Sequence, residues 1–215
     1  MKKVVSRLAV VGMIGAFAPL AHAADDSGFF LGAGVGSAKN AFRSDDFTLG
    51  NAAVAESRDE QAAGYKGLLG YRFTSSLALE AEYVNFGSFY YNYDGGAAGG
   101  SASTKYQVRT AGLAGILSLP FADNWSFIAK LGFARSEVKN TVNQASGALA
   151  TQFSAPGTSV RAKTNDVYGG LGLEYSMTKN LVLRGEYEDF GTVGDSNSTG
   201  RAKVNLTSAS LIYRF

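Results

Sequence analysis

Apolar and polar side chains alternate along residues 204–215. Phe215, Tyr213 and Leu211 fall on one face of this segment, and Arg214 falls on the other. A period of two residues is typical of a β-strand whose two faces meet different surroundings. The segment is therefore predicted to be a strand with one apolar face.

The same alternation predicts further strands, which bring the total to eight. They lie at 28–37, 63–73, 77–86, 106–119, 125–136, 166–175 and 181–190. The segment at 106–119 is apolar on both faces over much of its length, so its register stays open. Short turns alternate with longer polar or Gly-rich connections, at 38–62, 87–105, 137–165 and 191–203. This pattern predicts an all-β fold: an eight-stranded antiparallel up-and-down transmembrane β-barrel with both termini periplasmic.

Ten charged residues within the predicted strands share one face, and the opposite face, which carries the Leu and aromatic residues, has almost no charge in mid-strand. The ten are Lys66, Arg72, Glu80, Glu82, Lys130, Glu174, Arg184, Glu186, Glu188 and Arg214. A membrane barrel would direct them into its lumen, whereas a soluble barrel of the lipocalin type would direct them to solvent. Aromatic residues at the strand ends beside short turns, such as Tyr71, Trp125 and Tyr175, favour the membrane because they form an interfacial girdle. Tyr83, Phe133 and Tyr187 are candidates for the second girdle.

The two halves of the chain contain similar segments. Residues 77–87 and 181–191 are identical at six of eleven positions and share a Glu-Tyr-x-x-Phe-Gly motif. Two hairpins of one design suit a closed barrel, because both meet the same structural demands.

The first 23 residues have the features of a cleaved export signal. A basic start with Lys2, Lys3 and Arg7 precedes an apolar stretch, which ends at Ala21-His22-Ala23. Cleavage would leave one barrel domain, 24–215, with 17 basic and 18 acidic residues. The mature chain would then lack His as well as Cys, which excludes Ser-His-Asp, Cys-His and ordinary zinc chemistry. It also has no basic stripe for nucleic acid.

The same-face carboxylates Glu80/Glu82 and Glu186/Glu188 could serve acid–base catalysis, as in glycosidases. A charge-filled lumen is the favoured interpretation, because buried charges need partners. The glycines of 32–36 resemble a phosphate-binding loop but precede no helical pattern, so they more simply make room inside a small barrel.

Aromatic residues also gather in the predicted second long connection. If exposed, they could bind an unknown extracellular partner; otherwise they form the top of a hairpin that extends beyond the membrane. These residues are Phe89, Tyr90, Tyr91 and Tyr93.

Several of these segments together resemble the small outer-membrane barrels. They are Ala21-His22-Ala23, residues 64–73, the Glu-Tyr-x-x-Phe-Gly pair and Tyr213-Arg214-Phe215. The chain is similar to the transmembrane domain of outer membrane protein A and its OmpX-type and opacity-type relatives. The resemblance implies residence in the outer membrane of a Gram-negative bacterium, in contact with lipid and lipopolysaccharide. It also implies that periplasmic chaperones and the barrel-assembly machinery handle the chain, with Tyr213 and Phe215 as the assembly signal.

The expected role is non-enzymatic, structural or at the cell surface. The peptidoglycan-binding domain of some relatives is not expected, so wall tethering is not carried over. A narrow channel for small solutes and an adhesin that acts through 87–105 stay open as alternatives. A lipid-modifying barrel enzyme is disfavoured, because no nucleophile–base pair stands out. We expect no catalytic, cofactor-binding or metal-binding residues.

Overall fold

The computed structural model describes residues 27–47, 54–96 and 99–215, without the side chain of Ser44. The expected export signal, 1–23, lies outside these residues. The strands are β1 (Gly28–Phe42), β2 (Ala55–Asp59), β3 (Gln61–Arg72), β4 (Leu77–Asp94), β5 (Ser101–Ala122), β6 (Trp125–Ala145), β7 (Ser159–Ser176), β8 (Leu181–Asp195) and β9 (Gly200–Arg214). A short helix, α1 (Ser44–Phe47), follows β1, and a 3-10 helix, η2 (Gly147–Thr151), follows β6.

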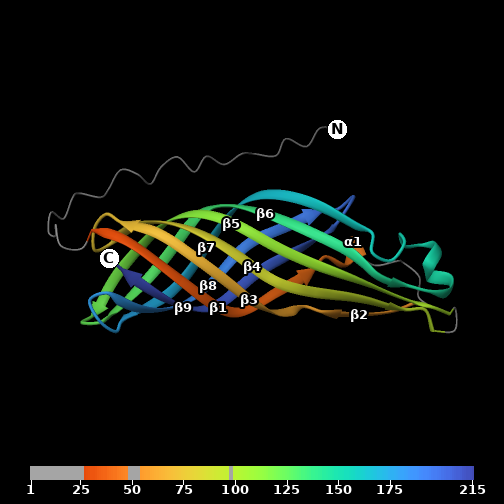
Figure 1. Ribbon diagram of the computed structural model, residues 1–215, viewed down its shortest axis with the longest axis horizontal. Helices are drawn as coiled ribbons and strands as arrows, with labels where there is room; N and C mark the ends of the chain where they lie inside the picture. The colour runs from red at the N-terminus through yellow and green to blue at the C-terminus, as the bar shows by residue number, and fades with distance from the viewer. Residues whose placement is uncertain (1–26, 48–53, 97–98) are drawn as a thin grey trace, which may run out of the picture.

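Eight of the strands close into a ring. Every pairing is antiparallel, in the order β4-β3-β1-β9-β8-β7-β6-β5, and β5 pairs with β4 to complete the circle. Figure 1 shows the tilted barrel, with the short turns and the C-terminus at one end and α1 and β2 at the other. The predicted fold class is confirmed. Within the described residues, no helix is long and apolar enough to cross a bilayer.

The predicted ring of eight strands is confirmed, but the predicted connections need correction. A ninth strand, β2, pairs with the far end of β4 beyond the point where β3 leaves it. Most residues assigned to long connections are strand instead: β5 and β6 run for 22 and 21 residues. The prediction failed there because Ser, Thr and Asn dilute the alternation, while inward-facing residues such as Phe89 and Val138 are still fully buried.

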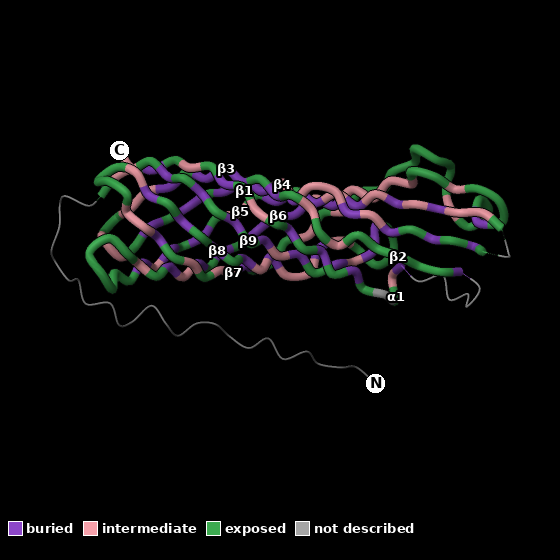
Figure 2. The backbone as a smooth tube through the Cα atoms, turned by 90° about the horizontal axis from the view of Figure 1, so that it is seen from below, coloured by how far each residue is buried: buried purple, intermediate pink, exposed green. Residues whose placement is uncertain are grey.

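Burial alternates along the strands (Figure 2), and it orients the two faces as the charge pattern predicted. Leu69, Leu131 and Leu171 are exposed, whereas Glu80 and Lys130 are buried. The alternation also fixes the register of β5, where Ile116 points inward and Leu113 outward. An apolar outer band and a polar interior match a barrel immersed in lipid.

The shared motif encodes the same irregularity in β4 and β8. Gly87 and Gly191 have φ angles of 82° and 71°, at the points where each strand shifts its register with the next. Asn85 and Asp189 accept a hydrogen bond from the glycine N–H two residues on, each at 3.0 Å. A residue with a Cβ would be strained at a positive φ, so these glycines mark two equivalent β-bulges.

At the end of the barrel with the longer connections, α1 is held by an ion pair. Arg201 on β9 donates from Nε and Nη2 to the Asp46 carboxylate at 2.7 and 3.0 Å, and its backbone N–H donates at 3.0 Å. The side chain of Phe47 then packs within the barrel mouth, stacked on Tyr91 with ring centroids 5.3 Å apart. The chain after β1 therefore folds back into the mouth.

This ion pair predicts a pH-dependent local contact. Hydrogen bonds from Arg201 hold the pKa of Asp46 below its ordinary value of 3.8. A depressed carboxyl pKa means that the contact stabilises α1 at neutral pH and is lost as the pH falls through that lowered value. D46N should speed amide hydrogen exchange at position 46 and at Arg201 at neutral pH. Its exposed neighbour supplies the control, D45N, which should leave exchange unchanged; equal acceleration in both variants would contradict the prediction.

Candidate functional site

The structure brings all ten predicted lumen charges into one ion-pair network. Five cations meet five carboxylates across the barrel axis, so the network is formally neutral. The residues come from six strands: Lys66 and Arg72 from β3, Glu80 and Glu82 from β4, Lys130 from β6, Glu174 from β7, Arg184, Glu186 and Glu188 from β8, and Arg214 from β9. Charges of both signs are needed because an unpaired ion in such a narrow interior is costly.

Lys130 is the centre of the network. Its Nζ lies 2.7 Å from Glu80, 3.2 Å from Glu82, 3.1 Å from Glu186 and 2.7 Å from Glu188. This reach follows from topology, because β6 lies two strands from β4 and two strands from β8 in the ring. One ammonium therefore bridges the carboxylate pairs of both halves of the chain.

Lys66 binds two of the carboxylates that Lys130 contacts, those of Glu186 and Glu188. Its Nζ donates to Glu186 and, at 2.8 Å, to Glu188 on the far strand β8. To do so it crosses in front of β1, where Gly34 presents no side chain. A Cβ on Gly34 would lie 2.2 Å from the hydroxyl of Ser210 and 2.9 Å from the backbone carbonyl oxygen of Ala209, so the close approach of β9 favours glycine here. The phosphate-loop interpretation of these glycines therefore fails, since they lie within a continuous strand.

Arg184 links this centre to the end with the short turns. Its guanidinium lies 2.6 Å from Glu80 and 2.6 Å from Glu174. Glu174 in turn binds Arg214 at 2.9 Å and Arg72 at 3.4 Å. Guanidinium groups suit this task because their planar donors can bind more than one carboxylate at once.

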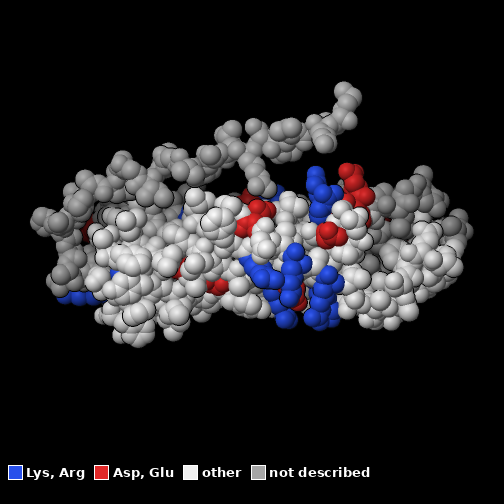
Figure 3. Space-filling view, turned by 90° about the horizontal axis from the view of Figure 1, so that it is seen from above, with Lys and Arg blue, Asp and Glu red and all other residues white. Residues whose placement is uncertain are grey.

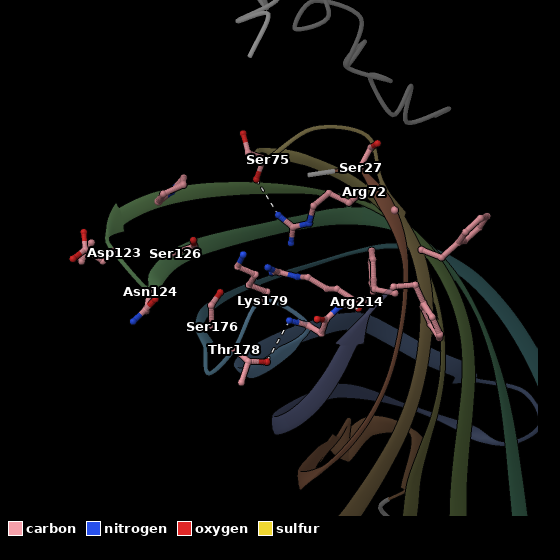
Figure 4. A pocket seen from close by; sticks show the side chains of 17 residues that line it. Ser27, Arg72, Ser75, Asp123, Asn124, Ser126, Ser176, Thr178, Lys179 and Arg214 are labelled. Atoms are coloured by element: carbon pink, nitrogen blue, oxygen red, sulfur yellow. Dashed lines mark hydrogen bonds between the residues drawn. The ribbon is translucent and has the colours of Figure 1, made fainter. Parts of the chain in front are cut away.

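A vestibule of about 680 Å³ opens below these arginines, at the end with the short turns. Figure 4 shows Arg72 and Arg214 beside this space, with Arg72 donating to the carbonyl oxygen of Ser75 at 2.9 Å. Access falls steeply with depth: the side chains of Arg214, Arg72 and Arg184 are 25%, 11% and 2% exposed. Water can therefore enter the vestibule but barely reaches the network above it.

Aromatic side chains cover the network on its other side. The rings of Phe86 and Phe190 meet edge to face across the barrel at 5.0 Å, and Tyr168 stacks on Phe190 at 4.9 Å. We did not predict this layer from the sequence. Its signal was present, since Phe86 and Phe190 occupy the same position in the repeated motif.

The aromatic residues considered for partner binding lie mostly inside the barrel. Phe89, Tyr91 and Tyr93 are at most 4% exposed, and only Tyr90 is partly accessible. These residues continue β4 beyond the bulge at Gly87. The inward-facing ones, Phe89, Tyr91 and Tyr93, belong to the core cluster that also contains Phe42 and Phe47 in the mouth. The prediction that these residues are exposed in a loop is therefore wrong for three of the four. The alternative, that they form the top of a hairpin, describes their placement.

The arrangement offers poor conditions for catalysis by the carboxylates. The side chains of Glu80, Glu82 and Glu188 have no exposed area, and each lies within ion-pair distance of a cation. A glycosidase needs two carboxyl groups with room for a sugar between them. The space between these pairs is filled by Lys130 instead.

Comparison with known proteins agrees with this architecture. The family model of the OmpA-like transmembrane domain matches residues 23–215. Outer membrane protein A of Serratia marcescens is 27% identical over 220 residues, covering 100% of this chain and 56% of the relative. The chain thus spans about half the length of that curated relative.

Solved structures of small outer-membrane barrels are similar to the chain in fold. Neisserial surface protein A has 18% identity and a TM-score of 0.50, covering 88% of this chain and 99% of its own. The N-terminal β-barrel domain of OprF from Pseudomonas aeruginosa has 12% identity and a TM-score of 0.47, covering 86% and 97%. Since the family model spans nearly all of the sequence, this chain belongs to the OmpA-like transmembrane domain family of outer-membrane β-barrels.

Proposed function

We propose that this protein is a non-enzymatic structural and surface barrel whose lumen is closed to ions. The observation that carries the proposal is the neutral network across the axis. The side chains of Lys66, Lys130, Glu80 and Glu188 have no exposed area, so bulk water does not reach them. Eight-stranded barrels are narrow enough for side chains to fill the interior, which fits this interpretation.

The outer surface supports a defined placement in the membrane. Outward-facing residues on β6 are apolar from Trp125 to Phe133, and the next ones, Arg135 and Glu137, are charged. Aromatic pairs such as Trp125–Tyr175 and Tyr213–Phe215 lie at the end with the short turns. We place this end and both termini in the periplasm, and the mouth with α1 outside the cell, by the general pattern of such barrels.

The proposed partners follow from this placement. Lipid would surround the apolar band, and lipopolysaccharide would meet the charged residues at the mouth end. Tyr213 and Phe215 are about half and three-quarters exposed, at 48% and 72%, so their side chains are accessible to an assembly factor. Recognition by the barrel-assembly machinery after transport by periplasmic chaperones is part of the same proposal.

A closed lumen predicts that the refolded protein does not conduct. Planar bilayers containing the barrel should show no unit conductance steps in potassium chloride, because ions would have to displace the Lys130 bridge. Heat-dependent mobility on a gel verifies folding of the same sample. Reproducible steps from folded wild-type protein would overturn closure and establish the narrow-channel alternative.

The network also predicts a large stability contribution from its central cation. K130M leaves four carboxylates with fewer cations, and removal of one partner of a buried ion pair typically costs about 3–5 kcal/mol. The free energy of unfolding in urea should fall by about that amount. K39M, which removes an exposed lysine of β1, should change it by less than about 0.5 kcal/mol.

A second variant separates charge balance from packing. K130M/E82Q removes one charge of each sign and should recover part of the lost stability. If K130M were as stable as K39M, the network would not hold the barrel together and the proposal would lose its support.

A further inference from the structure

Two adjoining hollows lie on the outer surface of β5, β6 and β7. One is an apolar groove of about 630 Å³ beside Leu113, Phe133 and Val167. The other, of about 250 Å³, is lined by three cations, Arg109, Arg135 and Lys163, and by one carboxylate, Glu137. Ala111 and Arg135 line both hollows, so the two form one continuous site.

The register of the strands explains why apolar and basic surfaces meet there. Leu113, Phe133 and Val167 form one row across the three strands, with exposed fractions of 52%, 75% and 50%. The next outward row toward the mouth contains Ala111 and Arg135. The surface therefore changes from apolar to basic within one row, and the small side chain of Ala111 leaves the groove open.

The following row completes the basic part of the site. Arg109, Glu137 and Lys163 are paired across the strands. Glu137 lies 3.6 Å from Lys163 and 3.8 Å from Arg161, distances beyond a normal hydrogen bond. Within the part of the chain that the structure describes, Arg109 and Arg135 have no ion-pair partner.

Cations outnumber carboxylates over this part of the surface. Outward-facing Arg109, Arg135, Lys139, Arg161 and Lys163 compare with Glu137 and Asp166. On the other side of the ring, Lys203 of β9 is instead paired with Asp189 at 2.7 Å. Figure 3 shows Lys and Arg side chains gathered in one zone, with Asp and Glu side chains beside them, on a face that is otherwise largely uncharged.

We propose that this site binds an acyl lipid with a phosphate monoester headgroup. An acyl chain would occupy the groove beside Leu113 and Phe133, and the phosphate would lie against Arg109, Arg135 and Lys163. A guanidinium group can donate two parallel hydrogen bonds to the oxygens of one phosphate. The double negative charge of a phosphate monoester also matches an excess of cations. The continuity of groove and hollow favours a lipid over free phosphate. The inference rests on the membrane placement proposed above and assigns a specific lipid site to it.

Lipid retention by the refolded full barrel tests this site. Dioleoyl phosphatidic acid, dioleoylglycerol and inorganic phosphate serve as the probes, with bound molecules counted by native mass spectrometry. Phosphatidic acid should bind with a stoichiometry of one, and the other two probes should bind at least about tenfold more weakly. R109Q/R135Q/K163Q should weaken phosphatidic acid binding at least about tenfold, since each cation near a lipid phosphate contributes substantially.

A matched control removes the same charge elsewhere. K39Q/K179Q/K203Q should retain wild-type affinity; equal loss in both triple variants would mean diffuse attraction and would overturn the site. A111L tests the groove by filling it, and should weaken phosphatidic acid binding, whereas A209L on the outer face of β9 should not. No effect of A111L would overturn the acyl-chain assignment.

The readouts separate this inference from the proposed function. A heat-modifiable barrel that inserts into bilayers without conducting, yet binds phosphatidic acid no better than dioleoylglycerol, would overturn the lipid site alone. A barrel that fails to insert would overturn the membrane placement itself.

Discussion

Charge neutrality inside a narrow closed ring is the constraint on which the rest of this structure depends. An ionised side chain buried without a partner is costly, so each charge that points into the lumen requires an opposite charge within reach. Lys130 satisfies this requirement for four carboxylates at once. Gly34 of β1 contributes to this arrangement, because the lack of a side chain there leaves space for Lys66 to reach β8.

The repeated motif shows how similar sequences meet this constraint with complementary differences. β4 and β8 lie four strands apart in both directions around the ring, so equivalent positions face each other. Glu80 in one segment corresponds to Arg184 in the other, and the two side chains are paired at 2.6 Å. The identical residues Phe86 and Phe190 meet in a direct ring contact, whereas the identical Glu82 and Glu186 both bind Lys130. The sequence differences between the two halves are thus as structurally meaningful as the identities.

Periodicity was sufficient to predict the barrel class and which residues face the lumen, because a strand alternates strictly between two environments. It failed to predict where strands end, since the alternation weakens beyond the lipid band while backbone pairing continues through Tyr91 and Tyr93. Contacts between distant segments, such as Asp46 with Arg201 or the row of Leu113 and Phe133, depend on register between strands. A single sequence read without its fold carries no direct record of that register.

The pairing of ions between opposite strands has a consequence for biogenesis. Arg184 and Glu80 are 104 positions apart in the chain, and Lys66 and Glu188 are 122 positions apart. A half-formed sheet would hold these groups at bilayer depth without their counterions, a state that hydrocarbon strongly disfavours. Insertion and circular closure are therefore energetically coupled: the chain gains a low-energy interior only when its first and last strands meet.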